Sequence, residues 1–263
     1  MPPRVAIVPP VPVPYREPLF RSLSERGVIE PRVVYLAARQ AGWDQPPDWF
    51  AGREGYPSEV LSGWQRSRRG RSPVTVARGL GAALERADPG CVVSWEYGPA
   101  TWRALAWCRR HGRPLVIFSE LTLWSDAALS SLQLRVHRLL APRAAGFIVA
   151  SSQGAERLAL LGVDRGRVEV ALQSADLAPL VTLPPRAGGR DGPVRVVVVG
   201  RLVPDKNLAL LLDAFAAAGL DRDAELVLHG TGPLEPPLRA QAARLGLPAS
   251  FRGALAPAAL PAA

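Results

Sequence analysis

The sequence is poor in the residue types on which several classes of protein depend. Its two cysteines, Cys91 and Cys108, are too few for a disulfide framework and lack the spacing of a zinc-binding pair. It has no run of 18 apolar residues, so we expect no transmembrane helix. The proline-rich start, MPPRVAIVPPVPVP, has one arginine and no cleavage site, which is not typical of a signal peptide. These absences predict a reduced, cytoplasmic protein.

Lysine is almost absent as well, although the chain is strongly basic. Lys206 is the only lysine among 32 lysine and arginine residues, and the formal net charge is +9, most of it in residues 1–183. An excess of positive charge favours nucleic acid, an anionic membrane face or a phosphorylated substrate as partner. Because no recognition-helix, RRM or zinc pattern is present, nucleic acid is not the expected partner.

Short apolar runs alternate with helical patterns along the whole chain. This alternation predicts βαβ units, a parallel sheet and an α/β fold with helices on both faces of the sheet. The expected strands are 4–8, 32–36, 59–61, 91–94, 115–118, 147–150, 168–172, 194–199, 225–228 and 250–252, and the expected helices are 18–26, 74–87, 99–110, 129–140, 155–161, 208–219 and 234–245. Residues 39–72 are otherwise expected to be irregular.

A stretch rich in proline and glycine, PPRAGGRDGP at 184–193, is the predicted linker between two domains. It separates residues 1–183 from residues 194–263. The second part has three expected strands at most, which is a thin core for an open parallel sheet. We therefore expect two Rossmann-like domains, of which the second is incomplete.

The stretch PVRVVVVGRLVPDKN predicts a phosphate-binding turn in the second domain. Val194–Val199 is expected to be a strand buried on both faces, followed by Gly200 and a loop with Arg201 and Lys206. A glycine turn, a basic loop and a helix N-terminus can together hold a phosphate, although the same pattern also fits an ordinary solvated loop. Asp205 is expected to cap the following helix.

Other candidates follow strands at the carboxyl edge of each predicted sheet, where α/β proteins bind ligands. Gly230 and Gly232 lie in the turn HGTG, a weak signal on its own. In the first domain Tyr15 and Arg16 follow the first strand, where they can either contact an acceptor or begin a helix. Glu96 and Glu120 follow later strands, and either carboxylate could contact an acceptor hydroxyl; a pair for glycoside hydrolysis is also conceivable.

A basic and aromatic stretch in the first domain has two possible interpretations. It contains Arg66, Arg68, Arg69 and Arg71 together with Trp43, Trp49 and Trp64. The stretch could contact an anionic membrane or a lipid phosphate. A solvated loop whose tryptophans fold onto the domain is the commoner case and the favoured interpretation.

Several blocks resemble family 4 glycosyltransferases, which have the two-Rossmann GT-B fold. VVVVGRLVPDKNLALLLDAFA resembles their donor-site loop, and ELVLHGTGPLEPPLRAQAARLGLPASFRGAL resembles the strand, Gly-x-Gly turn, helix and strand that follow. VPYREPLFRSL resembles their opening loop and helix, and RVHRLLAPRAAGFIVASSQGAERLALLGVDRGRVEVALQSAD resembles the end of their first domain.

The resemblance implies transfer of a sugar from a nucleotide-diphospho-sugar to an acceptor hydroxyl, with retention of configuration and without metal or cofactor. It implies that Arg201 and Lys206 bind the donor diphosphate and that Gly200, Gly230 and Gly232 lie near the nucleotide. The first domain would bind a saccharide or lipid-linked acceptor, with Tyr15, Arg16 and Glu120 as candidate contacts because of their place at the sheet edge. The resemblance assigns no catalytic residue to this chain, and Glu96 is a candidate only because it follows a strand. Peripheral contact with the inner face of the membrane is a further expectation.

The sequence departs from the family pattern in two respects. Members carry two glutamates seven residues apart late in the second domain, and a final helix, which these 263 residues do not include. Many members also have a histidine after the strand matched by 91–94, where this chain has Trp95-Glu96-Tyr97. A fragment or degenerate protein that binds only an acceptor or a membrane is therefore an alternative, and a GT-B epimerase or phosphorylase is another.

Overall fold

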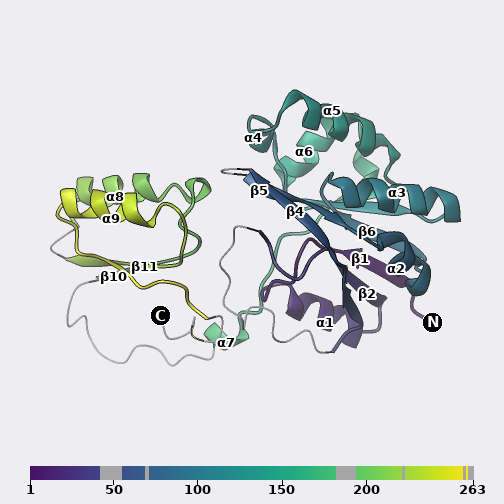
Figure 1. Ribbon diagram of the computed structural model, residues 1–263, viewed down its shortest axis with the longest axis horizontal. Helices are drawn as coiled ribbons and strands as arrows, with labels where there is room; N and C mark the ends of the chain where they lie inside the picture. Colours follow the sequence, from purple (N-terminus) through teal and green to yellow (C-terminus); the bar gives the residue numbers. More distant parts are fainter. Residues whose placement is uncertain (42–54, 69–70, 182–193, 221–222, 257–258, 260–263) are drawn as a thin grey trace. The chain divides into compact units, whose positions relative to one another are not determined.

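We describe the protein from a computed structural model, which covers residues 1–41, 55–68, 71–181, 194–220, 223–256 and 259 (Figure 1). The chain forms two compact units, and along the main chain the border between them falls between Asp176 and Leu177. The predicted linker at 184–193 lies outside the described residues. Each unit is described by itself.

The first unit is built on a parallel sheet, as the alternating pattern predicts. Among the described residues this sheet has seven strands in the order β3-β2-β1-β6-β7-β8-β9. The strands are β1 Arg4–Val8, β2 Glu30–Tyr35, β3 Ser58–Val60, β6 Cys91–Trp95, β7 Leu115–Ser119, β8 Gly146–Val149 and β9 Val168–Val170. The helices are α1 Glu17–Glu25, α2 Leu80–Ala87, α3 Pro99–His111, α4 Leu123–Asp126, α5 Ser131–Leu140 and α6 Ser152–Leu160, with 3-10 turns at Ala141–Arg143 and Arg165–Arg167.

Both faces of this sheet are packed, because successive residues of a strand point to opposite sides. In β1, Ala6 and Val8 join one buried cluster and Ile7 joins another. Leu80 and Leu84 of α2 pack in the first cluster, and Phe20 of α1 packs in the second. The prediction of helices on both faces is confirmed for this unit.

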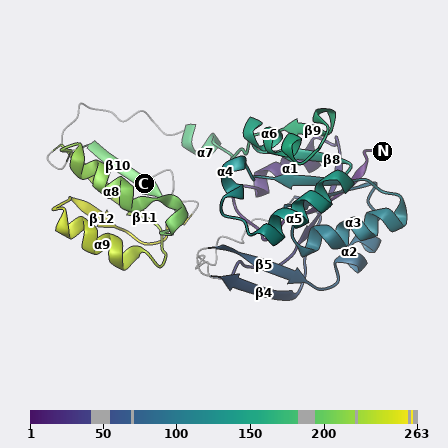
Figure 2. The same cartoon turned by 90° about the horizontal axis from the view of Figure 1, so that it is seen from above.

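The region before α2 differs from the prediction. Residues expected to be irregular form β4 Gly63–Arg68, which pairs with β5 Arg71–Ala77, and Figure 2 shows these two strands side by side. The predicted helix 74–87 is wrong in its first half, since α2 begins only at Leu80. Val74 and Val76 alternate with polar residues, and β-branched side chains at a period of two favour a strand over a helix.

The second unit has a smaller parallel sheet, and two of its described helices cover one face of it (Figure 1). Its described strands are β10 Val194–Val199, β11 Ala224–His229 and β12 Ala249–Phe251, in that order. Its helices are α7 Ala178–Val181, α8 Leu208–Ala217 and α9 Glu235–Arg244, with a 3-10 turn at Pro204–Lys206. Figure 1 shows α8 and α9 on the same side of β10 and β11. Leu212, Phe215, Leu226 and Leu238 are among the buried residues between these layers.

The prediction that Val194–Val199 is buried on both faces is wrong. Val196 and Val198 pack against the core of this unit, whereas Val197 and Val199 on the opposite face are exposed, Val199 by 51%. Arg195 on that same face pairs with Glu225 of β11, at 2.8 Å between Nε and Oε1. The valine run favours a strand, but the layers around it decide which face is covered.

Two expectations about membranes have different outcomes. Within the described part of the chain, no helix is both long and apolar enough to cross a bilayer. Of the predicted basic and aromatic stretch, Trp64 and Arg66 lie exposed on β4. Trp43, Trp49 and Arg69 lie outside the described residues, so the proposed patch remains a prediction.

Candidate active site

Polar side chains of the first unit meet at the carboxyl edge of three adjacent strands. Arg16 follows β1, Glu96 follows β6 and Glu120 follows β7, and these strands are neighbours in the sheet. Arg16 Nη2 lies 2.6 Å from Glu120 Oε1, and the backbone N–H of Glu120 donates to Glu96 Oε1 at 2.7 Å. The structure therefore brings together three side chains that the sequence places after separate strands, 104 residues apart at the most.

Glu96 is held in one conformation by its surroundings. Its φ of 53° lies in the left-handed region, which is uncommon for a residue with a side chain. The backbone N–H of Glu96 donates to the carbonyl of Phe118 at 2.9 Å, and its carbonyl accepts from Thr101 Oγ1 at 2.7 Å. Ser119 Oγ donates to Glu96 Oε2 at 2.8 Å. Both carboxyl oxygens are thus fixed at the sheet edge.

Burial raises the pKa of the Glu96 carboxyl from 4.5 to about 7. The hydrogen bonds from Glu120 N–H and Ser119 Oγ favour the carboxylate but do not offset the loss of solvation. A carboxyl group with a pKa near neutrality can accept or donate a proton under physiological conditions. Glu96 therefore has the chemistry that a candidate acid or base needs.

Aromatic rings surround the Arg16 guanidinium. Its Cζ lies 4.8 Å from the ring centre of Trp95 and 5.5 Å from that of Tyr15. Trp95 in turn stacks on Phe118 at 4.3 Å, so the guanidinium rests on a rigid surface. The Tyr15 side chain is partly open to solvent, with 40% exposure. An exposed ring beside a cation and a carboxylate can bind a ligand that has both apolar and hydroxyl surfaces.

A buried polar cluster behind this edge was missed by the sequence reasoning. Arg157 of α6 is only 1% exposed, and its Nε lies 2.7 Å from Asp126 Oδ1. Its Nη2 lies 2.7 Å from His137 Nδ1, and Tyr97 stacks on the His137 ring at 4.1 Å. The available signal was an arginine among the buried residues Ala155 and Leu158 of an amphipathic helix.

The ionisation of His137 follows from this cluster. Burial and the Arg157 charge lower the pKa of the imidazole from 6.5 to about 4. The ring is therefore neutral at physiological pH, and its Nδ1 accepts a hydrogen bond from Arg157. Arg157 also favours the ionised form of Glu96, so the cluster acts electrostatically on the sheet edge.

In the second unit, the predicted glycines lie where two strands end side by side. Val199 of β10 is in register with His229 of β11, so Gly200 and Gly230 are the next residues of the two strands. A Cβ atom on Gly230 would lie 1.8 Å from the Gly200 carbonyl oxygen, and one on Gly232 would lie 2.3 Å from the Leu202 oxygen. Only glycine allows these two backbones to approach so closely.

Lys206 extends back toward this junction. A Cβ atom on Gly200 would lie 4.0 Å from the Lys206 Cε, so the aliphatic chain of the lysine folds over the glycine turn. Lys206 is exposed, and no hydrogen bond or ion pair of its ammonium group occurs within the described residues. The structure thus places Lys206, Gly200 and Gly230 together, with Arg201 next in the chain.

The prediction for Asp205 is wrong. Asn207, with φ of 49°, precedes α8 as its N-cap residue, and Asp205 lies within the 3-10 turn Pro204–Lys206. The extra turn moves the N-cap position to Asn207, two residues beyond Asp205. Asp205 is exposed there and gives no side-chain cap.

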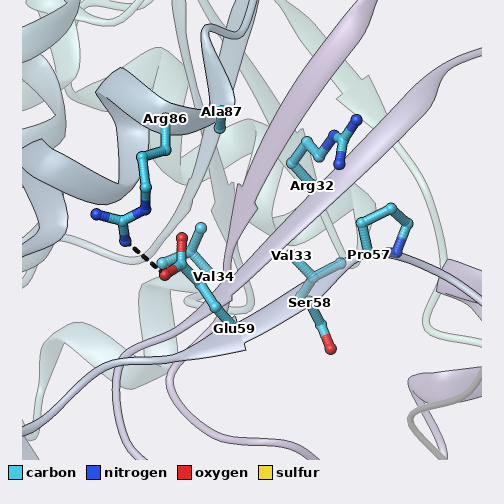
Figure 3. Close-up of a pocket in the computed structure, with 8 residues that line it drawn as sticks. All are labelled: Arg32, Val33, Val34, Pro57, Ser58, Glu59, Arg86 and Ala87. Atoms are coloured by element: carbon cyan, nitrogen blue, oxygen red, sulfur yellow. Dashed lines mark hydrogen bonds and ion pairs between the residues drawn. The ribbon is translucent and has the colours of Figure 1, made fainter.

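One further depression lies away from these candidate residues. It is lined by Arg32, Val33, Val34, Pro57, Ser58, Glu59, Arg86 and Ala87 (Figure 3). Arg86 Nη2 and Glu59 Oε2 pair at 2.7 Å across it. Because Ala87 ends α2, which leads into the beginning of β6, this depression is not at the carboxyl edge of the sheet. It brings together none of the predicted site residues.

The two units together define a class of protein. Each unit has a parallel sheet, and in each the candidate polar or glycine residues follow the carboxyl ends of adjacent strands. Open α/β sheets bind their ligands at that edge. The fold and the sites are those of a two-unit α/β protein of the Rossmann type.

The comparison with protein families is more specific. The model of the Glycosyl transferase 4-like domain matches residues 12–172, which is more than half of the chain. The chain therefore belongs to this family. No curated protein sequence is significantly similar to it.

Solved structures share the fold over almost the whole chain. The Anabaena HepE protein in complex with UDP and glucose is similar with a TM-score of 0.70 at 19% identity, covering 97% of this chain and 70% of that one. The putative UDP-N-acetylglucosamine 2-epimerase of Listeria monocytogenes is similar with a TM-score of 0.64 at 16% identity, covering 98% of this chain and 71% of that one. The lipopolysaccharide outer core galactosyltransferase WaaB is similar with a TM-score of 0.59 at 14% identity, covering 96% of this chain and 68% of that one. These similarities confirm the predicted GT-B-type α/β fold.

Proposed function

We propose that this chain acts as a glycosyltransferase that takes a hexose from a nucleotide-diphospho-sugar and transfers it to an acceptor hydroxyl with retention of configuration. The observation that carries the proposal is the junction of Gly200 and Gly230, over which Lys206 folds. Family membership supports a transferase, and similar folds occur in complexes with UDP and UDP-glucose. A UDP-sugar is therefore the donor to test first.

The proposed donor site uses Arg201 and Lys206 as its cations. When the bond between the anomeric carbon and the diphosphate breaks, negative charge grows on the diphosphate, so a fixed cation stabilises the transition state more than the ground state. Lysine supplies a compact charge and arginine a planar pair of donors. In this proposal the two side chains neutralise the diphosphate, and the reaction needs no metal or cofactor.

The proposed acceptor site is the carboxyl edge of β1, β6 and β7. The acceptor hydroxyl would attack the anomeric carbon from the face that the diphosphate leaves, which retains the configuration. Its proton would pass to the leaving phosphate oxygen, so the reaction does not require a side-chain base. Glu96 and Glu120 would orient the acceptor, and Tyr15 and Arg16 would contact it.

Isothermal titration calorimetry with UDP-, GDP- and ADP-sugars tests the donor. We expect one nucleotide class to bind measurably better than the other two, and equal weak binding of all three would contradict the proposal. Incubation with a labelled donor and analysis of the sugar product then distinguishes the chemistry. Because two of the similar folds belong to UDP-N-acetylglucosamine 2-epimerases, conversion of the free sugar nucleotide to its epimer is the second outcome to look for.

A further inference from the structure

The side chains before and after Glu96 pack on opposite faces of the sheet. If β6 continued as a regular strand, residues 95 and 97 would point to the same face, because successive side chains alternate. Tyr97 instead belongs to the buried cluster that includes Ala6. Trp95 packs against the cluster on the other face, which includes Ile7. The reversal occurs at Glu96, whose left-handed φ of 53° is strained and persists only where the surroundings hold it.

The two rings that flank Glu96 have different anchors. Trp95 stacks on Phe118 of the neighbouring strand, at 4.3 Å between ring centres. Tyr97 stacks on His137 of α5 at 4.1 Å, and Arg157 Cζ lies 5.6 Å from the Tyr97 ring centre, within the range of a cation–π contact. Arg157 Nη2 also donates to His137 Nδ1 at 2.7 Å. Arg157 therefore contacts the tyrosine ring directly and also holds the imidazole that stacks on it.

Stability alone does not explain an arginine at position 157. Its side chain is 1% exposed, and a charge removed from water is costly unless it is paired and fully hydrogen-bonded. Its Nε pairs with Asp126 Oδ1 at 2.7 Å, but its buried Nη1 has no hydrogen-bond partner among the described residues. An apolar side chain of similar size would fill the space without burying an incompletely paired charge. The arginine thus points to a role in the position of its neighbours.

We propose that Arg157 is a positioning residue for Glu96. Through His137 and Tyr97 it fixes the turn after β6, and this turn holds the Glu96 carboxyl at the sheet edge. There Ser119 Oγ donates to one carboxyl oxygen at 2.8 Å, and the Glu120 N–H donates to the other at 2.7 Å. Only the use of this carboxyl to orient an acceptor hydroxyl rests on the proposed function.

The direct charge of Arg157 is a weaker link to Glu96 than the contact through Tyr97. Burial raises the pKa of the Glu96 carboxyl to about 7, and the hydrogen bonds from Glu120 and Ser119 lower that pKa more than the Arg157 charge does. A carboxyl that leaves this buried place regains its solvation, so its pKa returns toward the ordinary value. Loss of position and loss of charge therefore change the pKa of Glu96 in opposite directions.

An NMR titration of the glutamate carboxyl carbons in the full chain tests the proposal, with the Glu96 signal assigned from Glu96→Gln. We expect Arg157→Met to release the turn, so the pKa of Glu96 should fall from about 7 toward 4.5. Arg157→Lys keeps the charge but lacks the planar fork that bonds Asp126 and His137 together, so the pKa should fall there too. A rise in Arg157→Met would mean that only the charge matters, and an unchanged pKa would mean that Arg157 only fills space. Either result would overturn the proposal.

A pair of variants at Tyr97 keeps the test decisive if the Arg157 variants do not fold. Tyr97→Leu removes the ring that Arg157 and His137 hold but leaves the pair of Arg157 with Asp126 in place. The pKa of Glu96 should fall as in Arg157→Met. Tyr97→Phe keeps the ring and removes a hydroxyl that has no hydrogen-bond partner in the described part of the chain, so the pKa should stay near 7. Equal values in the two Tyr97 variants would show that the ring does not anchor Glu96.

Arg103→Met is the matched control for the loss of an arginine. Arg103 lies on α3 of the same unit and donates to the backbone carbonyl of Ala77. Its replacement should leave the pKa of Glu96 at about 7. A fall as large as in Arg157→Met would show that any loosening of the unit releases the carboxyl, which would contradict a specific role for Arg157.

The test is separate from that of the proposed function. Calorimetry with UDP-glucose should give the same affinity for Arg157→Met and the unchanged chain, because the proposed donor site is in the second unit. If the pKa of Glu96 falls in Arg157→Met and no nucleotide-sugar binds, the positioning role stands and the proposed function fails. If the nucleotide-sugar binds and the pKa does not fall, the proposed function stands and the positioning role fails.

Discussion

Lys206 is the residue on which the proposed donor site depends most. Its chain folds over Gly200, and within the described residues its ammonium group has no ionic partner that would have to be displaced by a phosphate. A charge-assisted hydrogen bond of this kind contributes about 1.5–3 kcal/mol. The side chain can supply that energy without any rearrangement of a neighbouring carboxylate.

Lys206→Ala should therefore weaken the binding of UDP, or of the preferred nucleotide, by roughly 10- to 150-fold, as measured by calorimetry. Lys206→Arg keeps the charge and should retain most of the affinity. Asp205→Ala, on the same exposed turn, is the matched control and should change affinity little. Unchanged affinity in Lys206→Ala would remove this side chain from the donor site.

Gly230 is the residue whose replacement should disturb the second unit most. An added Cβ would overlap the Gly200 carbonyl, a backbone atom that cannot move alone, and the φ of Gly230 is 148°. We expect Gly230→Ala to destabilise the unit by about 3 kcal/mol or more, in the range of severe backbone effects. Hydrogen exchange of the β10 and β11 amides measures this. Intrinsic fluorescence would not report on these strands, because all tryptophans and tyrosines precede residue 125.

Gly246→Ala is the control for that experiment. Gly246 also has a positive φ, 66°, but a Cβ there would meet nothing within 4 Å. Only the conformational cost of about 1–2 kcal/mol is expected. Equal losses in the two variants would mean that the close approach of the two backbones does not matter.

At the scale of the elements, Glu96 after β6 and His137 of α5 change the stability of the first unit with pH in opposite directions. The raised pKa of Glu96 gives stability that is complete below pH 4.5 and is lost as pH rises through about 7. The lowered pKa of His137 gives stability that is complete above pH 6.5 and is lost as pH falls through about 4. Between pH 4.5 and 6.5 the slopes, about 1.4 kcal/mol per pH unit each, cancel.

Replacing either Glu96 or His137 should reveal the pH dependence of stability that the two groups cancel together. We expect the unfolding free energy of the first unit to change little between pH 6.5 and 4.5 in the unchanged chain. Over the same interval Glu96→Gln should lose about 3 kcal/mol as pH falls, and His137→Gln should gain about 3 kcal/mol. Urea unfolding followed by tryptophan fluorescence measures it, because Trp64, Trp95, Trp102, Trp107 and Trp124 all lie in the first unit. Slopes of the same sign in both variants would contradict this assignment.

Most elements could be predicted because their patterns are local. The strand Arg4–Val8 begins and ends where the apolar run does, and α3 ends beside Gly112 as the glycine signal predicts. Val74–Ala77 belongs to the helix predicted over 74–87, whose stop signal at Asp88-Pro89-Gly90 does not show where the helix begins. Pairing with Gly63–Arg68 decides in favour of a strand, and that pairing is not visible in either segment alone.

The candidate sites could be predicted only in part. Arg16, Glu96 and Glu120 are predictable because the carboxyl ends of neighbouring parallel strands meet at one edge. Arg157 was not, since its partners Asp126 and His137 come from other helices and only packing brings them together. The exposure of Val197 and Val199 was missed for a similar reason, because a valine run alone does not show how many layers surround it.

At the scale of the whole molecule, the two units have separate cores and separate candidate sites. The buried clusters of the first unit share no residue with that of the second. A nucleotide bound at the Gly200–Gly230 junction should therefore stabilise the second unit, by about 2.7 kcal/mol at a ligand concentration 100 times its Kd. Hydrogen exchange with and without UDP should show slower exchange in β10, β11 and α8.

The amides of β1, β6 and β7 serve as the internal control for that measurement, and they should exchange at the same rate with and without UDP. Protection confined to the segments around Arg16 and Glu120 would place the nucleotide on the first unit. That result would exchange the donor and acceptor roles proposed here for the two sites.

Strand β10 also affects how the protein must be handled. Among the described strands it pairs with β11 alone, so one row of its backbone N–H and C=O groups has no strand beside it. That row borders the exposed Val197 and Val199, and apolar strand edges of this kind are templates on which another chain can add by β-pairing. We expect aggregation of this protein to start at β10, so low protein concentration during refolding should improve recovery.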